Sequence, residues 1–230
     1  MNVPLWLSST LVLDARKALW FPQERTLAVA NLYLGWTPGE EPAAGDETVA
    51  QLLALAADYQ PQRVVLLGRL LHPEAPRPGT TERLRALLEA LGERTGIVLT
   101  GDPDDPAFAT LLREAGWEGG AVPYWQCGKH FLMHGCAEAA LPPGALEEEG
   151  ACRVIATETP GILLGEAAPV CCPCFLFSDG VLLLPAFSPW VTPLDFRHET
   201  WHDSQLECLG WKQAVAIAAG KLLPMGLPPP

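Results

Sequence analysis

The spacing of hydrophobic and polar residues along this chain follows two patterns, and the first gives way to the second at Gly119-Gly120. Before that point, short runs rich in Leu and β-branched residues alternate with longer segments whose apolar residues recur every three to four positions. The short runs predict strands and the longer segments predict helices. The predicted strands are 26–31, 63–67 and 97–100, and the predicted helices are 48–59, 80–94 and 106–115. This alternating order is typical of a parallel sheet.

Two further patterns complete the first half. Residues 11–13 and 18–20 predict a small hairpin, and 37–46, rich in Pro, Gly and Glu, predicts a loop. In the second half, Pro and Gly separate short runs at 130–133, 153–156, 174–177 and 181–184, which predict further strands. Residues 141–150 read as a linker, and 203–220 predict a last helix that ends at Gly220. We therefore expect one domain over 1–200, and a C-terminal helix and tail over 201–230.

Several predicted strands end in segments where polar residues and glycines gather. Because α/β folds hold their chemistry in loops at strand ends, these segments are the candidate site. They are Ala-Asn-Leu-Tyr-Leu-Gly (30–35), Leu-Gly-Arg-Leu-Leu-His (67–72), Thr-Gly-Asp-Pro-Asp-Asp (100–105), Met-His-Gly (133–135) and Val-Ile-Ala-Thr-Glu-Thr-Pro (154–160).

The order and spacing of these segments resemble the calcineurin-like metallophosphoesterases. The resemblance is closest to the ligase-associated DNA damage response endonuclease family of bacteria and covers about residues 10–195. That family reads A-D-L-H-L-G-K, L-G-D-x-x-H, G-N-H-D, a lone His, and G-H-x-H-P. Its P-C-F-L and L-P-A-F-G segments look like 173–176 and 184–188 here. The resemblance implies a four-layer α/β/β/α sandwich of two mixed sheets flanked by helices.

Most of the metal ligands that the resemblance implies are replaced in this chain. The positions are Asn31 for the first Asp, Tyr33 for the first His, Arg69 for the bridging Asp, Asp102 and Pro103 for Asn and His, and Thr157 and Thr159 for the last two His. Only His134 matches an implied ligand, while Asp104 and His72 match other family residues. A two-metal phosphoesterase needs several anionic or imidazole ligands at once. The resemblance therefore implies a catalytically inactive binding or scaffolding protein, with no cofactor and with a protein partner.

A second function stays open, which is a phosphoesterase or nuclease with a reduced ligand set. It would use His72 and Asp104 for catalysis, and Asp102 and His134 to hold one Mn or Zn ion. Arg69 also has two interpretations. Its guanidinium, which is always protonated, either replaces the lost metal charge beside Asp102 or Asp104, or points to solvent.

Charge and composition limit the classes of binding partner and the cell compartment that we expect for this protein. The 230 residues include 15 basic and 27 acidic ones, and the net charge of −12 argues against binding a nucleic-acid backbone, which requires Lys and Arg. The seven cysteines show no disulfide-framework spacing, and the N-terminal stretch lacks the basic start of a signal peptide. No apolar run is long enough to span a membrane. We therefore expect a cytoplasmic protein.

Two other motifs are weaker. His198-Glu199-Thr200-Trp201-His202 fits H-E-x-x-H, but after Glu207 and Cys208 the chain has no Asp, Glu or His to complete a zinc site. We predict a polar surface turn that leads into the last helix. Cys171-Cys172-Pro173-Cys174 contains C-x-x-C without a second pair, which favours buried structural thiols. The chain has eight Trp, and any that are exposed would mark a partner surface.

Overall fold

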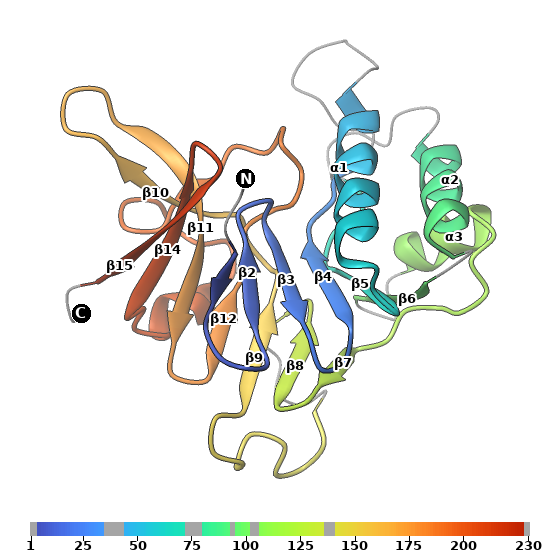
Figure 1. Cartoon of the computed structure of the whole chain (residues 1–230), viewed down its shortest axis with the longest axis horizontal. Helices are drawn as coiled ribbons and strands as arrows, with labels where there is room; N and C mark the ends of the chain where they lie inside the picture. The colour runs from blue at the N-terminus through green and yellow to red at the C-terminus, as the bar shows by residue number, and fades with distance from the viewer. Residues whose placement is uncertain are drawn as a thin grey trace.

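The computed structural model describes residues 4–34, 44–71, 80–92, 95–101, 106–135 and 141–227. Two mixed sheets lie face to face, and three α-helices cover the outer face of the first sheet (Figure 1). These helices are α1 (Ala44–Tyr59), α2 (Thr80–Gly92) and α3 (Pro106–Glu114). None of the described helices combines the length and apolar character needed to cross a membrane. The α/β class and the pair of mixed sheets agree with the sequence-based expectation.

The first sheet has six strands in chain order. They are β1 (Leu5–Trp6), β2 (Val12–Asp14), β3 (Ala18–Phe21), β4 (Thr26–Ala30), β5 (Arg63–Leu67) and β6 (Gly96–Thr100). The first four strands pair antiparallel, whereas β4, β5 and β6 pair parallel. The predicted hairpin and the three predicted strands of this half are thus present. Helix α1 begins at Ala44, earlier than predicted, so the end of the predicted 37–46 loop is helical.

The second sheet has nine strands and uses the rest of the chain. They are β7 (Tyr124–Cys127), β8 (His130–Met133), β9 (Cys152–Ile155), β10 (Pro160–Leu164), β11 (Val170–Ser178), β12 (Val181–Leu183), β13 (Leu194–Asp195), β14 (Gln213–Ala218) and β15 (Lys221–Gly226). The order is β13-β10-β11-β12-β9-β8-β7, and β14 pairs with both β11 and β15. On its outer face lie loops and the 3-10 helix η2 (Ser204–Cys208).

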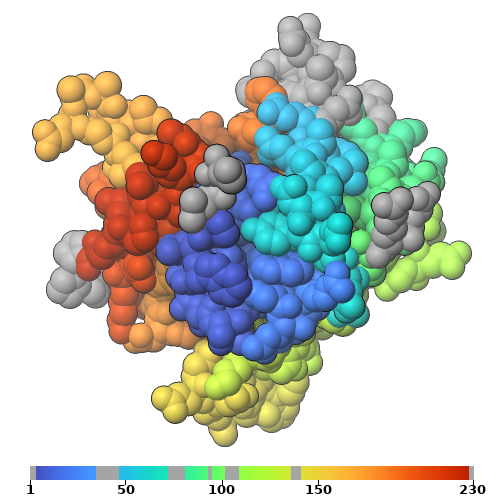
Figure 2. All heavy atoms as spheres, viewed as in Figure 1, coloured from blue at the N-terminus to red at the C-terminus, as the bar shows by residue number. Residues whose placement is uncertain are grey.

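The predicted C-terminal helix over 203–220 is wrong. Residues 213–226 form the β14–β15 hairpin, and β14 pairs antiparallel with β11 inside the second sheet. The turn residues Ala219 and Gly220 both have positive φ, at 48° and 70°. Two such residues are typical of a tight hairpin turn, so Gly220 closes a hairpin and does not cap a helix. Figure 2 shows this C-terminal segment, in red, against the N-terminal strands, in blue.

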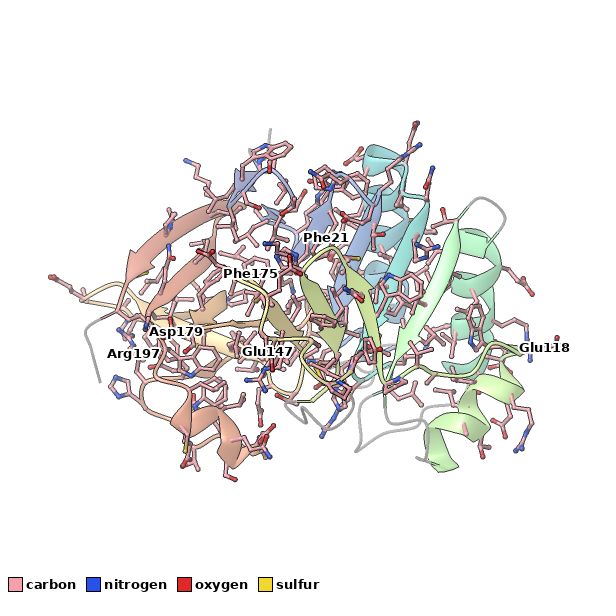
Figure 3. The ribbon with its side chains drawn as sticks, turned by 90° about the horizontal axis from the view of Figure 1, so that it is seen from below. Phe21, Glu118, Glu147, Phe175, Asp179 and Arg197 are labelled. Carbon is pink, nitrogen blue, oxygen red and sulfur yellow. The ribbon has the colours of Figure 1, made fainter. Side chains whose placement is uncertain are left out.

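Alternating burial along the strands produces three cores. On β5, Val64 and Leu66 face the helices, while Val65 and Leu67 face the second sheet. This period of two is the geometry of a strand with both faces buried. Phe21 and Phe175, both fully buried, fill the space between the sheets and lie in the middle of the molecule in Figure 3. The third core lies on the outer face of the second sheet and includes Trp201.

Candidate functional site

The candidate site lies where parallel strands of both sheets end. Strands β4 and β5 are parallel neighbours, as are β8 and β9. Their carboxyl ends therefore lie at shared edges, which is where α/β proteins place ligands. We call the residues that follow these strands, 31–34, 68–71, 134–135 and 156–159, the strand-end cluster.

Gly68 is the point at which these loops meet. A Cβ atom added to Gly68 would lie 2.4 Å from Asn31 Oδ1, 3.0 Å from the Ala156 carbonyl oxygen and 3.0 Å from His134 Nδ1. Its φ of +73° also lies in the left-handed region that favours glycine. The loops after β4, β5, β8 and β9 thus approach one another too closely for any side chain at this position.

Asn31 joins three of these loops through hydrogen bonds. Its side chain is fully buried, and its Nδ2 donates to the carbonyl oxygens of Ala156, at 2.9 Å, and Glu158, at 3.2 Å. Its Oδ1 accepts a bond from the Arg69 backbone nitrogen at 2.9 Å. The φ of Asn31 is +53°, a region where Asn is tolerated better than most residues. Both ends of the amide are therefore engaged by the protein backbone.

Tyr33, Arg69 and Glu158 form an electrostatic group beside Asn31. Burial raises the pKa of the Tyr33 phenol above 10.0. The Arg69 guanidinium, which hydrogen-bonds the phenol, lowers that pKa, and the Glu158 carboxylate raises it. Tyr33 is 7% exposed and Glu158 is 6% exposed, whereas Arg69 is exposed. Tyr33 thus stays a neutral phenol next to a guanidinium and a carboxylate.

Sequence reasoning did not select Glu158, although it is the one acid between Thr157 and Thr159. Its Oε1 accepts a hydrogen bond from the Asp203 backbone nitrogen at 3.0 Å, and its Oε2 lies 3.2 Å from His202 Nδ1. The signal was a carboxylate in a strand-end loop. Its contacts hold the segment that follows β13 against the strand-end cluster.

Other members of the strand-end cluster are neutral or aromatic. The buried Thr157 hydroxyl has no hydrogen-bond partner among the described residues.

The segment that resembles the family's L-P-A-F-G, residues 184–188, packs against the loop that follows β4. There, Phe187 donates its backbone N–H to the Ala30 carbonyl at 2.7 Å, and Ser188 donates to Asn31 at 3.4 Å. The Ser188 carbonyl in turn accepts a bond from Lys17 Nζ at 2.8 Å.

The structure therefore brings together five of the predicted positions, which are Asn31, Tyr33, Arg69, His134 and Thr157. The sixth described position, Thr159, lines a separate small cavity with Lys17 and Pro160. The predicted positions His72, Asp102, Pro103 and Asp104 lie outside the described residues. The pairing of Arg69 with Asp102 or Asp104 accordingly stays a prediction, whereas its contact with Tyr33 is observed.

The described donors do not fit a pair of divalent cations. Two such ions, held about 3.5–4 Å apart, need several anionic or imidazole ligands. The Asn31 amide is occupied by backbone groups, Tyr33 is a neutral phenol, and Arg69 is a cation. Among the described residues, no three His, Cys, Asp or Glu side chains gather closely enough to hold a metal ion. His134 is the one described imidazole of the set.

The H-E-x-x-H segment forms a surface turn, as predicted, although no α-helix follows it in the described part of the chain. His198 Nε2 lies 3.8 Å from Asp195 Oδ2, whereas His202 contacts Glu158, so the two imidazoles meet different carboxylates. The Cys171–Cys174 run lies on β11. Cys174 is fully buried, and burial raises the pKa of Cys171 to about 11, which suits structural thiols and not reactive ones.

Comparison with solved structures identifies the fold. The structure is similar to that of the nuclease MPE from Pseudomonas putida, with a TM-score of 0.67 and 22% sequence identity, over 97% of this chain and 99% of that chain. A second similar structure, TT1561 of Thermus thermophilus, has a TM-score of 0.37 and 14% identity over 87% of this chain and 97% of that chain. No protein-family model and no curated protein matches the chain. The chain has the calcineurin-like phosphoesterase fold, and the first similarity establishes that fold alone.

Proposed function

We propose that this chain is a member of the ligase-associated DNA damage response endonuclease family that has lost two-metal catalysis and acts by binding a protein. Hydrogen bonds of the Asn31 side chain hold the strand-end cluster in the way that metal ions hold it in hydrolytic members, and the Arg69 guanidinium supplies a positive charge beside it. The motif resemblance and the shared fold with a nuclease support the family assignment. The proposed setting is DNA repair in the bacterial cytoplasm.

The observation that carries this proposal is the environment of Asn31. A metal-ligating carboxylate needs free oxygen atoms directed at the ion. Here the side chain directs an amide NH₂ at two backbone carbonyl oxygens and gives its oxygen to a backbone N–H. A carboxylate in this position would face the carbonyl oxygens of Ala156 and Glu158 without a proton to share. The local structure therefore suits an amide better than a metal ligand.

Arg69 supports the same conclusion. It stands where the family has an anion that bridges two metal ions, and a guanidinium there repels divalent cations. It hydrogen-bonds Tyr33, and the Glu158 carboxylate also acts on that phenol. This arrangement supplies one fixed positive charge to a region that two metal ions would otherwise neutralise.

A protein partner suits the surface charge. The net charge of −12 gives little support for neutralising a row of phosphates. Loss of catalysis leaves the fold and its surfaces available for recognition. A basic protein surface is the complement that an acidic chain favours, because complementary potentials speed encounter and select partners.

The alternative is hydrolysis with a reduced ligand set, and the position of His134 favours it. His134 Nδ1 would lie 3.0 Å from a Cβ on Gly68, so this imidazole is in the strand-end cluster, where the family has a metal ligand. In this alternative, His134 and Asp102 hold one Mn or Zn ion, and His72 and Asp104 take part in catalysis.

Hydrolysis of bis(p-nitrophenyl) phosphate with added manganese tests the proposal. Wild-type protein is expected to show only the background rate, equal to that of matched Asp102→Ala and His134→Ala variants. An activity that co-purifies with the wild-type chain and disappears in both variants would overturn the proposal and support the alternative. Circular dichroism of each variant shows whether it is folded.

A further inference from the structure

An open cavity of about 360 Å³ lies on the outer side of the second sheet. Its lining contains the aromatic residues Phe196, Trp201 and Trp211, which belong to or pack against the third core. Arg197, His198, Glu199, Thr200, Leu206 and Glu207 complete the lining. The volume lies within the usual range of ligand sites. No member of the strand-end cluster lines the cavity. Figure 3 shows Arg197, one of its lining residues, at one end of the molecule.

The walls of this aromatic cavity are held in place by hydrogen bonds. The buried Glu158 carboxylate accepts from the Asp203 backbone nitrogen, and Asp203 caps η2 by accepting from the Gln205 nitrogen. At the other side, Glu199 Oε1 accepts from the Asp195 backbone nitrogen at 3.0 Å. A preorganised wall loses less entropy when a partner binds.

The charged side chains at the rim differ in the partners they have within the protein. Arg197 donates to the Leu163 carbonyl at 3.0 Å and to Asp195 Oδ1 at 3.4 Å, and His198 faces the same Asp195 carboxylate. Glu199 and Glu207 are exposed. Arg197 and His198 are exposed as well, but both face the buried Asp195 carboxylate, whereas Glu207 and the second carboxylate oxygen of Glu199 have no such basic partner among the described residues.

The floor is aromatic, with Trp201 7% exposed and Trp211 half-buried, so the Trp211 ring offers more of the accessible surface. The two rings lie 6.3 Å apart between centroids and are tilted by 47°. Trp faces attract cations, and the attraction is stronger for Trp than for other aromatic side chains. An aromatic floor beside two accessible carboxylates favours a cationic group. A guanidinium fits best, because it stacks on ring planes and also meets carboxylates with two parallel hydrogen bonds.

We propose that the aromatic cavity binds an arginine side chain from a basic segment of a partner protein. The net charge of −12 favours such a partner over a nucleic acid. The inference rests on the proposed function only in taking a protein as the partner, and it is independent of whether the strand-end cluster hydrolyses phosphodiesters.

The test follows the indole N–H signals of ¹⁵N-labelled protein during titration with the tripeptide Gly-Arg-Gly. The neutral isostere Gly-citrulline-Gly is the matched ligand. Trp201→Phe and Trp211→Phe variants assign the two signals. Gly-Arg-Gly is expected to shift both signals in a saturable way, and Gly-citrulline-Gly is expected to bind at least about tenfold more weakly, since it lacks the charge.

The rim is tested with Glu199→Gln and Glu207→Gln combined, which should weaken Gly-Arg-Gly binding about fivefold, as expected for two exposed ion pairs. The control combines Glu82→Gln and Glu89→Gln on α2, which removes the same charge from exposed positions elsewhere and should leave binding unchanged.

Three results would overturn the inference. They are no saturable shift of the two indole signals, equal binding of both tripeptides, and stronger shifts with single-stranded oligothymidylate than with Gly-Arg-Gly. Any of them, combined with background hydrolysis, would leave the proposed function standing. Arginine binding by a protein that hydrolyses phosphodiesters would instead overturn the proposed function alone.

Discussion

Replacing Asn31 with Ala should cost about 4 kcal/mol of unfolding free energy. The side chain is fully buried and makes three hydrogen bonds to backbone groups of three residues. Each such bond contributes about 1 kcal/mol net, and each partner left unpaired in a buried site adds to the loss. Ala at a φ of +53° adds roughly 1 kcal/mol of backbone strain, which Asn bears more easily.

Urea unfolding followed by Trp fluorescence measures this loss. The Asn31→Gly variant is the control, because it loses the same hydrogen bonds without the backbone strain. It should be more stable than Asn31→Ala by roughly 1 kcal/mol. A loss below about 1 kcal/mol for Asn31→Ala would contradict this prediction, since it would mean that water replaces the amide without cost.

Three further outcomes are expected. Burial lowers the pKa of Lys17 from 10.5 to about 8. Between those pH values the unfolded chain binds more protons than the folded chain, so the loss of unfolding free energy that the buried ammonium causes is largest below pH 8. Lys17→Met removes this penalty and also the hydrogen bond to the Ser188 carbonyl, so it should raise the unfolding free energy by only about 1–2 kcal/mol at pH 7. Urea melts should show the gain shrinking from pH 8 to 10.5, and a constant gain would contradict this. His198→Ala combined with His202→Ala should leave zinc content by mass spectrometry unchanged, because the two imidazoles meet different carboxylates; loss of a stoichiometric zinc would count against it. Arg69→Ala should cost only about 0–1 kcal/mol because Arg69 is exposed, and should raise the pKa of Tyr33 in an NMR titration of labelled tyrosine; an unchanged pKa would show that the two side chains do not interact.

The sequence predicts the first half of the fold well because each element there has one strong periodicity. Strand β5 begins and ends as predicted, and its Val and Leu residues are buried on both faces. In the second half, strand β8 also has the predicted bounds. The C-terminal hairpin was missed because the run Ala214–Ala218 is apolar throughout. Such a run fits a helix or a strand equally, and pairing with the distant β11 decides between them.

The sequence indicated which loops meet at the candidate site, but it did not indicate the hydrogen bonds between them. Motif order placed Asn31, Arg69 and His134 in one cluster, and the structure brings their loops together at Gly68. The role of Glu158 was missed because its partners, His202 and Asp203, lie 44 and 45 residues further along the chain. Hydrogen bonds between segments so far apart leave no local signal in the sequence.

In the proposed function, the strand-end cluster is held by the hydrogen bonds of the Asn31 side chain and not by two metal ions. Calorimetric titration of metal-free protein with manganese tests it most directly, with His134→Ala as the matched variant. We expect no saturable two-ion binding at micromolar concentration, and identical traces for both proteins. Binding of two ions per chain at micromolar affinity, abolished in His134→Ala, would contradict it.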